Sequence, residues 1–138
     1  MAAGPEIIGA AAFVAIKFAG YRYAGIVLNR HYKDLPAVSP NIFGVARTCL
    51  GFVAGVSLTF AVAQWNFSHQ EPMWYLLLFP VRLAEWLLII GLFYERRCTN
   101  IGWLRLLKAS FYGSLWSYAL DIPAALSVFV MPGGMWIC

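Results

Sequence analysis

The sequence predicts an all-α fold, an integral membrane bundle of four transmembrane helices that forms a single domain over residues 1–138. Three observations predict it. Of the 138 residues, 62% are hydrophobic and only 12% are charged, whereas an ordinary soluble domain has about 25% charged residues. The apolar residues gather in four long runs, and a helix needs roughly 20 such residues to cross a bilayer. The basic residues concentrate in two of the three connections between these runs.

The first predicted helix covers residues 7–28. Its apolar run is too long for the core of a signal peptide and has only Glu6 as a charge before it, so we expect a retained helix. A polar connection with Pro36 and Pro40 then leads to the second predicted helix, residues 42–65. Proline and polar residues favour a turn between two helices.

The third predicted helix covers residues 73–94 and the fourth residues 103–131. Short polar connections, residues 66–72 and 95–102, precede them. The fourth run is long for a single crossing, so we expect that helix to tilt or to extend beyond the bilayer. Together the four runs use most of the chain and leave short connections.

Positive charge predicts the orientation of the helices. Arg30 and Lys33 lie in the first connection, and Arg96 and Arg97 lie in the third. The N-terminal stub, the second connection and the C-terminal tail contain no lysine or arginine. Because basic connections stay in the cytoplasm, both termini are expected outside. We expect a multi-pass protein of a bacterial inner membrane, or of a eukaryotic endomembrane or plasma membrane.

Four ionisable residues fall well inside the apolar runs: Lys17, Arg82, Glu85 and Asp121. At ~1.5 Å per residue they lie roughly 14–18 Å from the outer ends of their helices, near the middle of a core ~30 Å thick. We expect Arg82 and Glu85 to pair along one helix, and Lys17 to pair with Asp121 across helices. An unpaired charge at this depth costs at least ~2.5–3.5 kcal/mol, so the set should face inward as a neutral cluster.

Small residues mark one face of the second helix and one face of the fourth. Gly51 and Gly55 form a GxxxG pattern, which permits a close helix contact inside the bundle or with another chain. The serines of the fourth helix share a face with the aspartate; they are Ser110, Ser114 and Ser117. They serve either close packing or a polar pathway that ends at Asp121.

The remaining polar residues predict surface roles. Arg22 and Arg47 lie nearer the cytoplasmic ends of their helices, where they can snorkel to lipid headgroups or bind an anionic headgroup. The three cysteines form no metal-like cluster and both histidines fall in connections, so no metal site and no cofactor are predicted. Nucleic acid is excluded as a partner, because the basic residues flank apolar runs instead of forming a patch.

Three functions remain open from the sequence. The leading hypothesis is a non-catalytic subunit of a larger membrane assembly, with the bilayer and other membrane subunits, or copies of itself, as partners. The alternative is a small oligomeric transporter or channel that uses Glu85 and Asp121, and mid-helix prolines are typical of the broken helices of transporters. A second alternative is a membrane enzyme that acts on a lipid through Arg47, Arg82, Glu85 and Asp121.

Overall fold

The computed structural model describes residues 4–63, 72–95 and 102–130 of the chain. This part consists of four α-helices and one π-helical turn, and it contains no strand. The elements are α1 (Gly4–His31), α2 (Pro40–Ala63), α3 (Pro72–Ile90), η1 (Gly91–Glu95) and α4 (Trp103–Val130). The predicted all-α class with four helices is therefore confirmed, and each helix overlaps one of the four predicted runs.

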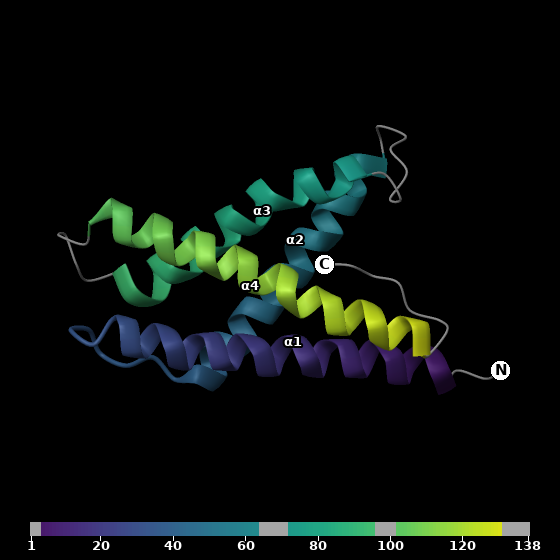
Figure 1. Ribbon diagram of the computed structural model, residues 1–138, viewed down its shortest axis with the longest axis horizontal. Coiled ribbons are helices and arrows are strands. Elements are labelled where there is room, and N and C mark those ends of the chain that lie inside the picture. The colour runs from purple at the N-terminus through teal and green to yellow at the C-terminus, as the bar shows by residue number, and fades with distance from the viewer. Residues whose placement is uncertain (1–3, 64–71, 96–101, 131–138) are drawn as a thin grey trace.

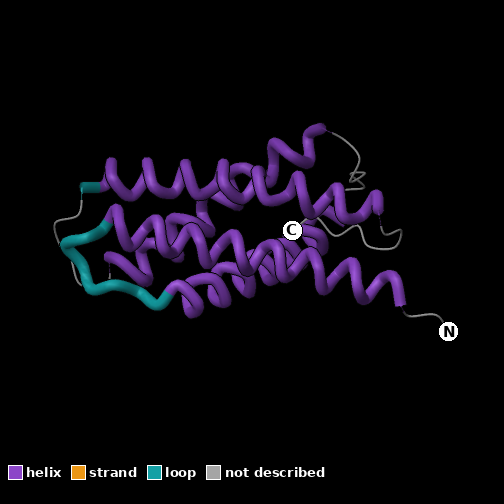
Figure 2. Tube along the Cα trace, turned by 60° about the horizontal axis from the view of Figure 1, so that its bottom comes forward, coloured by secondary structure: helices purple, strands orange, loops and turns teal. Residues whose placement is uncertain are grey.

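The helices alternate in direction along the chain (Figures 1 and 2). Each helix contacts the next one in sequence, and α1 also contacts α4, which closes the bundle. Such an up-down arrangement follows from short connections, because a helix that turns back immediately must lie antiparallel to its neighbour. Side chains from all four helices can therefore meet in one interior.

Asn29 ties the connection between α1 and α2 to the bundle. Its side-chain amide donates a hydrogen bond to the carbonyl of Val38 (2.7 Å), and its oxygen accepts one from the Val38 amide (3.1 Å). The same oxygen accepts a hydrogen bond from the Tyr94 hydroxyl at 2.8 Å. α2 then begins at Pro40, a residue well suited to the first turn because its missing amide has no helical partner there.

Aromatic side chains fill the core at this end of the bundle. The turn η1 continues α3 and brings Tyr94 onto Tyr32, with their ring centroids 5.0 Å apart. Phe43 of α2 packs against Trp86 and Phe93 at centroid distances of 6.0 and 5.9 Å. Trp86 is 1% exposed and lies at the contact of α3 with α4. These rings fix the distances between the helices.

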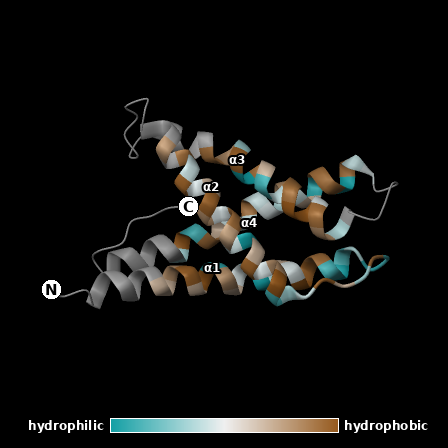
Figure 3. Ribbon diagram, turned by 180° about the vertical axis from the view of Figure 1, so that it is seen from behind, coloured by the Kyte–Doolittle hydropathy of each residue, from teal (hydrophilic) through white to brown (hydrophobic). Residues whose placement is uncertain are grey.

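The outward surface of the bundle is strongly apolar. On α2, Phe52 is 65% exposed and Phe60 is 72% exposed. Hydrophobic residues recur along all four helices (Figure 3). Two stretches, Ala11–His31 and Pro40–Leu58, are long and apolar enough to cross a membrane.

Candidate functional site

Every helix sends at least one charged side chain into the interior of the bundle. We call this set the charge network: Lys17 from α1, Arg47 from α2, Arg82 and Glu85 from α3, and Asp121 from α4. The three cations are 1–3% exposed, Glu85 is 9% exposed, and the Asp121 side chain is 17% exposed. Charges so deeply buried need partners, because each has lost its hydration.

Asp121 joins three helices through two ion pairs. Its Oδ1 contacts Nζ of Lys17 on α1, and its Oδ2 contacts Nη2 of Arg82 on α3. The pair with Lys17 is the one that the sequence predicts. The predicted pair of Arg82 with Glu85 is wrong: Arg82 reaches across to α4 instead of along its own helix. Arg82 therefore pairs with Asp121 on the facing helix α4 and not with Glu85, three residues along α3.

Glu85 pairs with Arg47, and this second ion pair joins α3 to α2. Arg47 Nη2 lies 2.6 Å from Glu85 Oε2. The guanidinium of Arg47 also lies against the rings of Tyr21 and Trp86, 4.9 and 5.1 Å from their centroids. Such stacking stabilises a cation in a desolvated site. The prediction that Arg47 reaches lipid headgroups is therefore wrong, because it is a core residue.

Arg22 differs from Arg47 in its position. It is exposed on α1, outside the charge network, so its contact with a lipid headgroup stays a prediction. The sequence does hold a signal for Arg47: it follows Gly44 by three residues and precedes Gly51 by four. Helical spacing therefore places Arg47 on the same face as these small residues. The small residues predict a packing surface on this face, and Arg47 belongs to it.

Ser117 of α4 lies where the network meets the aromatic core. Its Oγ accepts a hydrogen bond from Nε1 of Trp86 at 2.9 Å. Longer hydrogen bonds reach the same oxygen from the Tyr21 hydroxyl (3.4 Å) and from Nη2 of Arg47 (3.5 Å). Ser114 donates to the carbonyl of Ser110 on its own helix at 2.9 Å. The predicted serine face thus points inward, and Ser117 connects it to α1, α2 and α3.

Aromatic rings lie beside the other two cations as well. The guanidinium of Arg82 lies 4.2 Å from the ring centroid of Tyr118. Nζ of Lys17 lies 5.4 Å from the centroid of Phe13 and 5.9 Å from that of Tyr21. Each buried cation therefore combines a carboxylate partner with an aromatic face.

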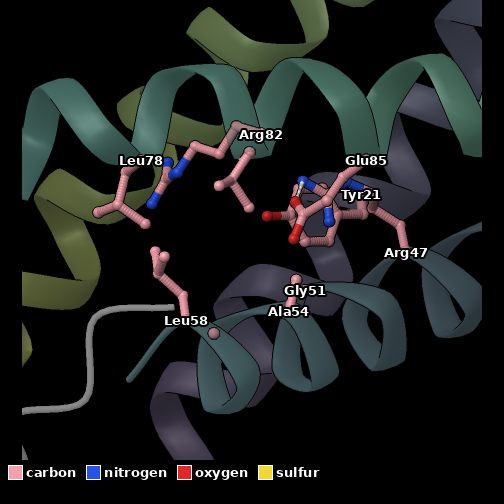
Figure 4. Close-up of a pocket in the computed structure, with 10 residues that line it drawn as sticks. Tyr21, Arg47, Gly51, Ala54, Leu58, Leu78, Arg82 and Glu85 are labelled. Atoms are coloured by element: carbon pink, nitrogen blue, oxygen red, sulfur yellow. Dashed lines mark ion pairs between the residues drawn. The ribbon is translucent and has the colours of Figure 1, made fainter. Parts of the chain in front are cut away.

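A narrow pocket adjoins the network between α2 and α3 (Figure 4). Its polar lining comes from Arg47, Arg82 and Glu85, with Tyr21 of α1 beside them. Small and apolar residues form the remainder: Gly51, Ala54, Gly55, Leu58, Leu78 and Val81. The volume open to the centre of a water molecule in this pocket is ≈ 10 Å³. A cavity that holds one water molecule needs about this volume. The pocket therefore accommodates a group of one or a few atoms.

The chemistry of the site is dominated by ion pairing. Within residues 4–63, 72–95 and 102–130, no group of three or more histidine, cysteine, aspartate or glutamate residues is placed to hold a metal ion. Both carboxylates of the network contact cations from other helices. The geometry is one that holds helices together, with a small polar pocket at its edge.

Comparison with known proteins gives no relative for this chain: no family model matches it, no curated protein matches it, and no solved structure matches it.

Proposed function

We propose that the chain is a four-span integral membrane protein with both termini outside, and that it serves as a non-catalytic subunit of a larger membrane assembly. The observation that carries this proposal is the charge network. Ion pairs from all four helices meet in the interior, and the pocket beside them has space for about one water molecule. The interior ion pairs fix the helices in register. The pocket beside them is too small for a substrate of more than a few atoms.

The outer surface supports the membrane part of the proposal. Large side chains on α2 and α4 face outward, among them Phe52, Phe60 and Leu104, each at least 65% exposed. A soluble monomer rarely exposes contiguous apolar patches of more than a few hundred Å². Lipid and neighbouring membrane helices are the surroundings in which such a surface is stable. The charged residues of the network, by contrast, point away from that surface.

Thiol labelling tests the topology with cysteines that the chain already has. In a Cys49→Ser background, variants would keep only Cys98, in the third connection, or only Cys138, at the C-terminus. A membrane-impermeant thiol reagent applied to intact cells should label Cys138 alone. Cys98 should react only after permeabilisation. Labelling of Cys98 in intact cells, or protection of Cys138, would contradict the proposed orientation.

Copurification tests the role as a subunit. The tagged full chain, extracted from its native membrane in mild detergent, should retain a defined partner polypeptide at fixed stoichiometry. Asp121→Asn should lower the recovery of that partner, because the carboxylate holds three helices in register. Gly91→Ala is the matched control, since a Cβ at Gly91 meets no atom within 4 Å. Purification of the chain as a monomer without any partner polypeptide, in every mild detergent, would contradict the proposal.

One observation favours the second candidate, a small transporter or channel. Arg82 and Glu85 line the pocket between α2 and α3, so a polar group that enters there meets both charges. Transport would require the pocket to widen, and Pro80, two residues before Arg82, removes one backbone hydrogen bond of α3. Flux in liposomes should then fall in Glu85→Gln and in Asp121→Asn. Unchanged flux in both variants would eliminate this candidate.

A further inference from the structure

The end of the bundle where α1 finishes and α4 begins (Figure 1) is strongly basic. We call the sequence stretches 29–41 and 95–108 the basic end. Together they contain six basic residues and two acidic ones: Arg30, Lys33, Arg96, Arg97, Arg105 and Lys108 against Asp34 and Glu95. By contrast, the N-terminal segment and the second connection contain Glu6 and Glu71 and no lysine or arginine. Whichever side chains pair, the basic end keeps an excess of four positive charges.

Arg105 is held at the basic end by three contacts with the end of α1 and the first connection. Its Nη2 donates a hydrogen bond to the carbonyl of His31, and its guanidinium lies 4.4 Å from the ring centroid of Tyr32. Its Nη1 lies 4.0 Å from Oδ2 of Asp34, whose side chain is 88% exposed. The Arg105 side chain itself is 37% exposed, so part of this fixed cation is open to the surroundings.

Lys108 extends the same positive surface along α4. It is exposed and follows Arg105 by three residues, a spacing that makes two side chains neighbours on a helix surface. Side chains on a helix lean toward its N-terminus, and α4 begins at the basic end. Trp103, the first residue of α4, is 68% exposed, and tryptophan is typical of the headgroup level of a membrane. The ammonium of Lys108 is therefore expected near that level.

An apolar strip continues from Lys108 along the same face of α4. Phe111, Leu115 and Ile122 follow Lys108 at helical spacing, and they are 46%, 46% and 64% exposed. At ~1.5 Å per residue, the distance from Lys108 to Ile122 is about 21 Å. One leaflet of a hydrocarbon core ~30 Å thick has about 15 Å for its acyl chains. The face thus offers positive charge at one level and enough apolar surface beneath it for a whole acyl chain.

We propose that an anionic phospholipid binds along α4, with its phosphate on Lys108 and Arg105 and its acyl chains on the strip of Phe111, Leu115 and Ile122. A free phosphate or a nucleic acid would use the charges alone, whereas a lipid uses both parts of the surface. Anionic lipids are concentrated in the cytoplasmic leaflet, where the proposed orientation puts the basic end. The inference rests on the proposed membrane insertion and is independent of any partner subunit.

Native mass spectrometry of the full chain in a neutral detergent tests the proposal. Phosphatidylglycerol and phosphatidylcholine with the same acyl chains are titrated separately, and the dissociation constant of the first lipid adduct is measured. A lysine or arginine near an anionic headgroup contributes about fivefold in affinity, so phosphatidylglycerol should bind at least about fivefold tighter. Glycerophosphoglycerol, the same headgroup without acyl chains, should not displace it at equal concentration. Equal affinity for the two lipids, or displacement by the free headgroup, would overturn the proposal.

Lys108→Gln locates the site, with Lys108→Arg as its matched control. Lys108 is exposed, so neither substitution should disturb the fold, and thermal unfolding checks this. Lys108→Gln should raise the dissociation constant for phosphatidylglycerol about fivefold and leave that for phosphatidylcholine unchanged. Lys108→Arg, which keeps the charge, should bind like the wild type. Wild-type binding by Lys108→Gln, or an equal loss in both variants, would overturn the proposal.

The same preparation separates this inference from the membrane part of the proposed function. A chain that stays monodisperse after the detergent is removed would contradict membrane insertion, and with it the lipid site. A chain that needs detergent but binds both lipids equally would overturn the lipid site alone.

Discussion

Gly113 of α4 lies against the indole of Trp86, and Gly113→Ala should destabilise the bundle. A Cβ at this position would lie 2.3, 2.5 and 2.7 Å from Cδ2, Cε3 and Cε2 of the Trp86 ring. The ring has little freedom to move away, because it is 1% exposed. It also donates a hydrogen bond to Ser117, which lies on α4 like Gly113. Either α3 and α4 separate or the indole turns and loses that bond.

The magnitude follows from three contributions. Overpacking of a filled core costs about 1–3 kcal/mol, and loss of the indole hydrogen bond adds about 1 kcal/mol. The higher helix propensity of alanine offsets about 1 kcal/mol. The free energy of unfolding should therefore fall by about 1–3 kcal/mol.

Two other glycines provide a graded comparison in the same thermal unfolding assay. A Cβ at Gly20 would lie 2.4 Å from Cδ2 of Leu120, which is the end of a flexible and half-buried side chain. Gly20→Ala should therefore cost less than Gly113→Ala. Gly91→Ala, with open space, should be as stable as the wild type or more stable by up to about 1 kcal/mol, because alanine favours a helical turn. A Gly113→Ala protein as stable as Gly91→Ala would refute the packing of Trp86 against α4.

Three further substitutions test other contacts, two by thermal unfolding and the third by proteolysis. Asp121→Asn leaves two buried cations without their shared carboxylate and should cost about 3–5 kcal/mol; wild-type stability would contradict both ion pairs. Ser117→Ala removes the acceptor of Nε1 of Trp86, and a loss of about 1–3 kcal/mol is expected for the unpaired donor. Asn29→Ala releases the connection over residues 32–39, so a protease should cut there faster than in the wild type; an unchanged rate would argue against its anchoring role.

The sequence was sufficient to predict the helices and the inward position of several polar residues. Run length and polar connections identify four helices, because an apolar run of more than 20 residues has few other stable forms. The pair of Lys17 with Asp121 could be anticipated, since both lie at similar depth and carry opposite charge. The membrane orientation stays a prediction that rests on Arg30, Lys33, Arg96 and Arg97.

The partners of Arg82 and Arg47 could not be predicted in this way. Spacing along α3 places Arg82 near Glu85, but the rotation of α3 about its axis decides which facing helix each side chain meets. Contacts between helices, such as that of Trp86 with Ser117 on α4, accompany that rotation, and no pattern within α3 reveals them. The spacing of α2 does not reveal the burial of Arg47, because that burial depends on Tyr21 and Trp86, two rings from other helices that flank its guanidinium. The spacing of residues along one helix does not predict such contacts between side chains of different helices.

A double-mutant cycle on Arg47 and Glu85 tests most directly whether buried charge holds the helices together. Arg47→Met and Glu85→Met each leave one buried charge alone and should cost about 3–5 kcal/mol, whereas the double variant should lose much less, because replacing both members of a buried pair is often nearly neutral. The two side chains contact at 2.6 Å, so the effects should be strongly non-additive. Thermal unfolding in neutral detergent measures all four proteins. Single losses that simply add in the double variant would contradict the account.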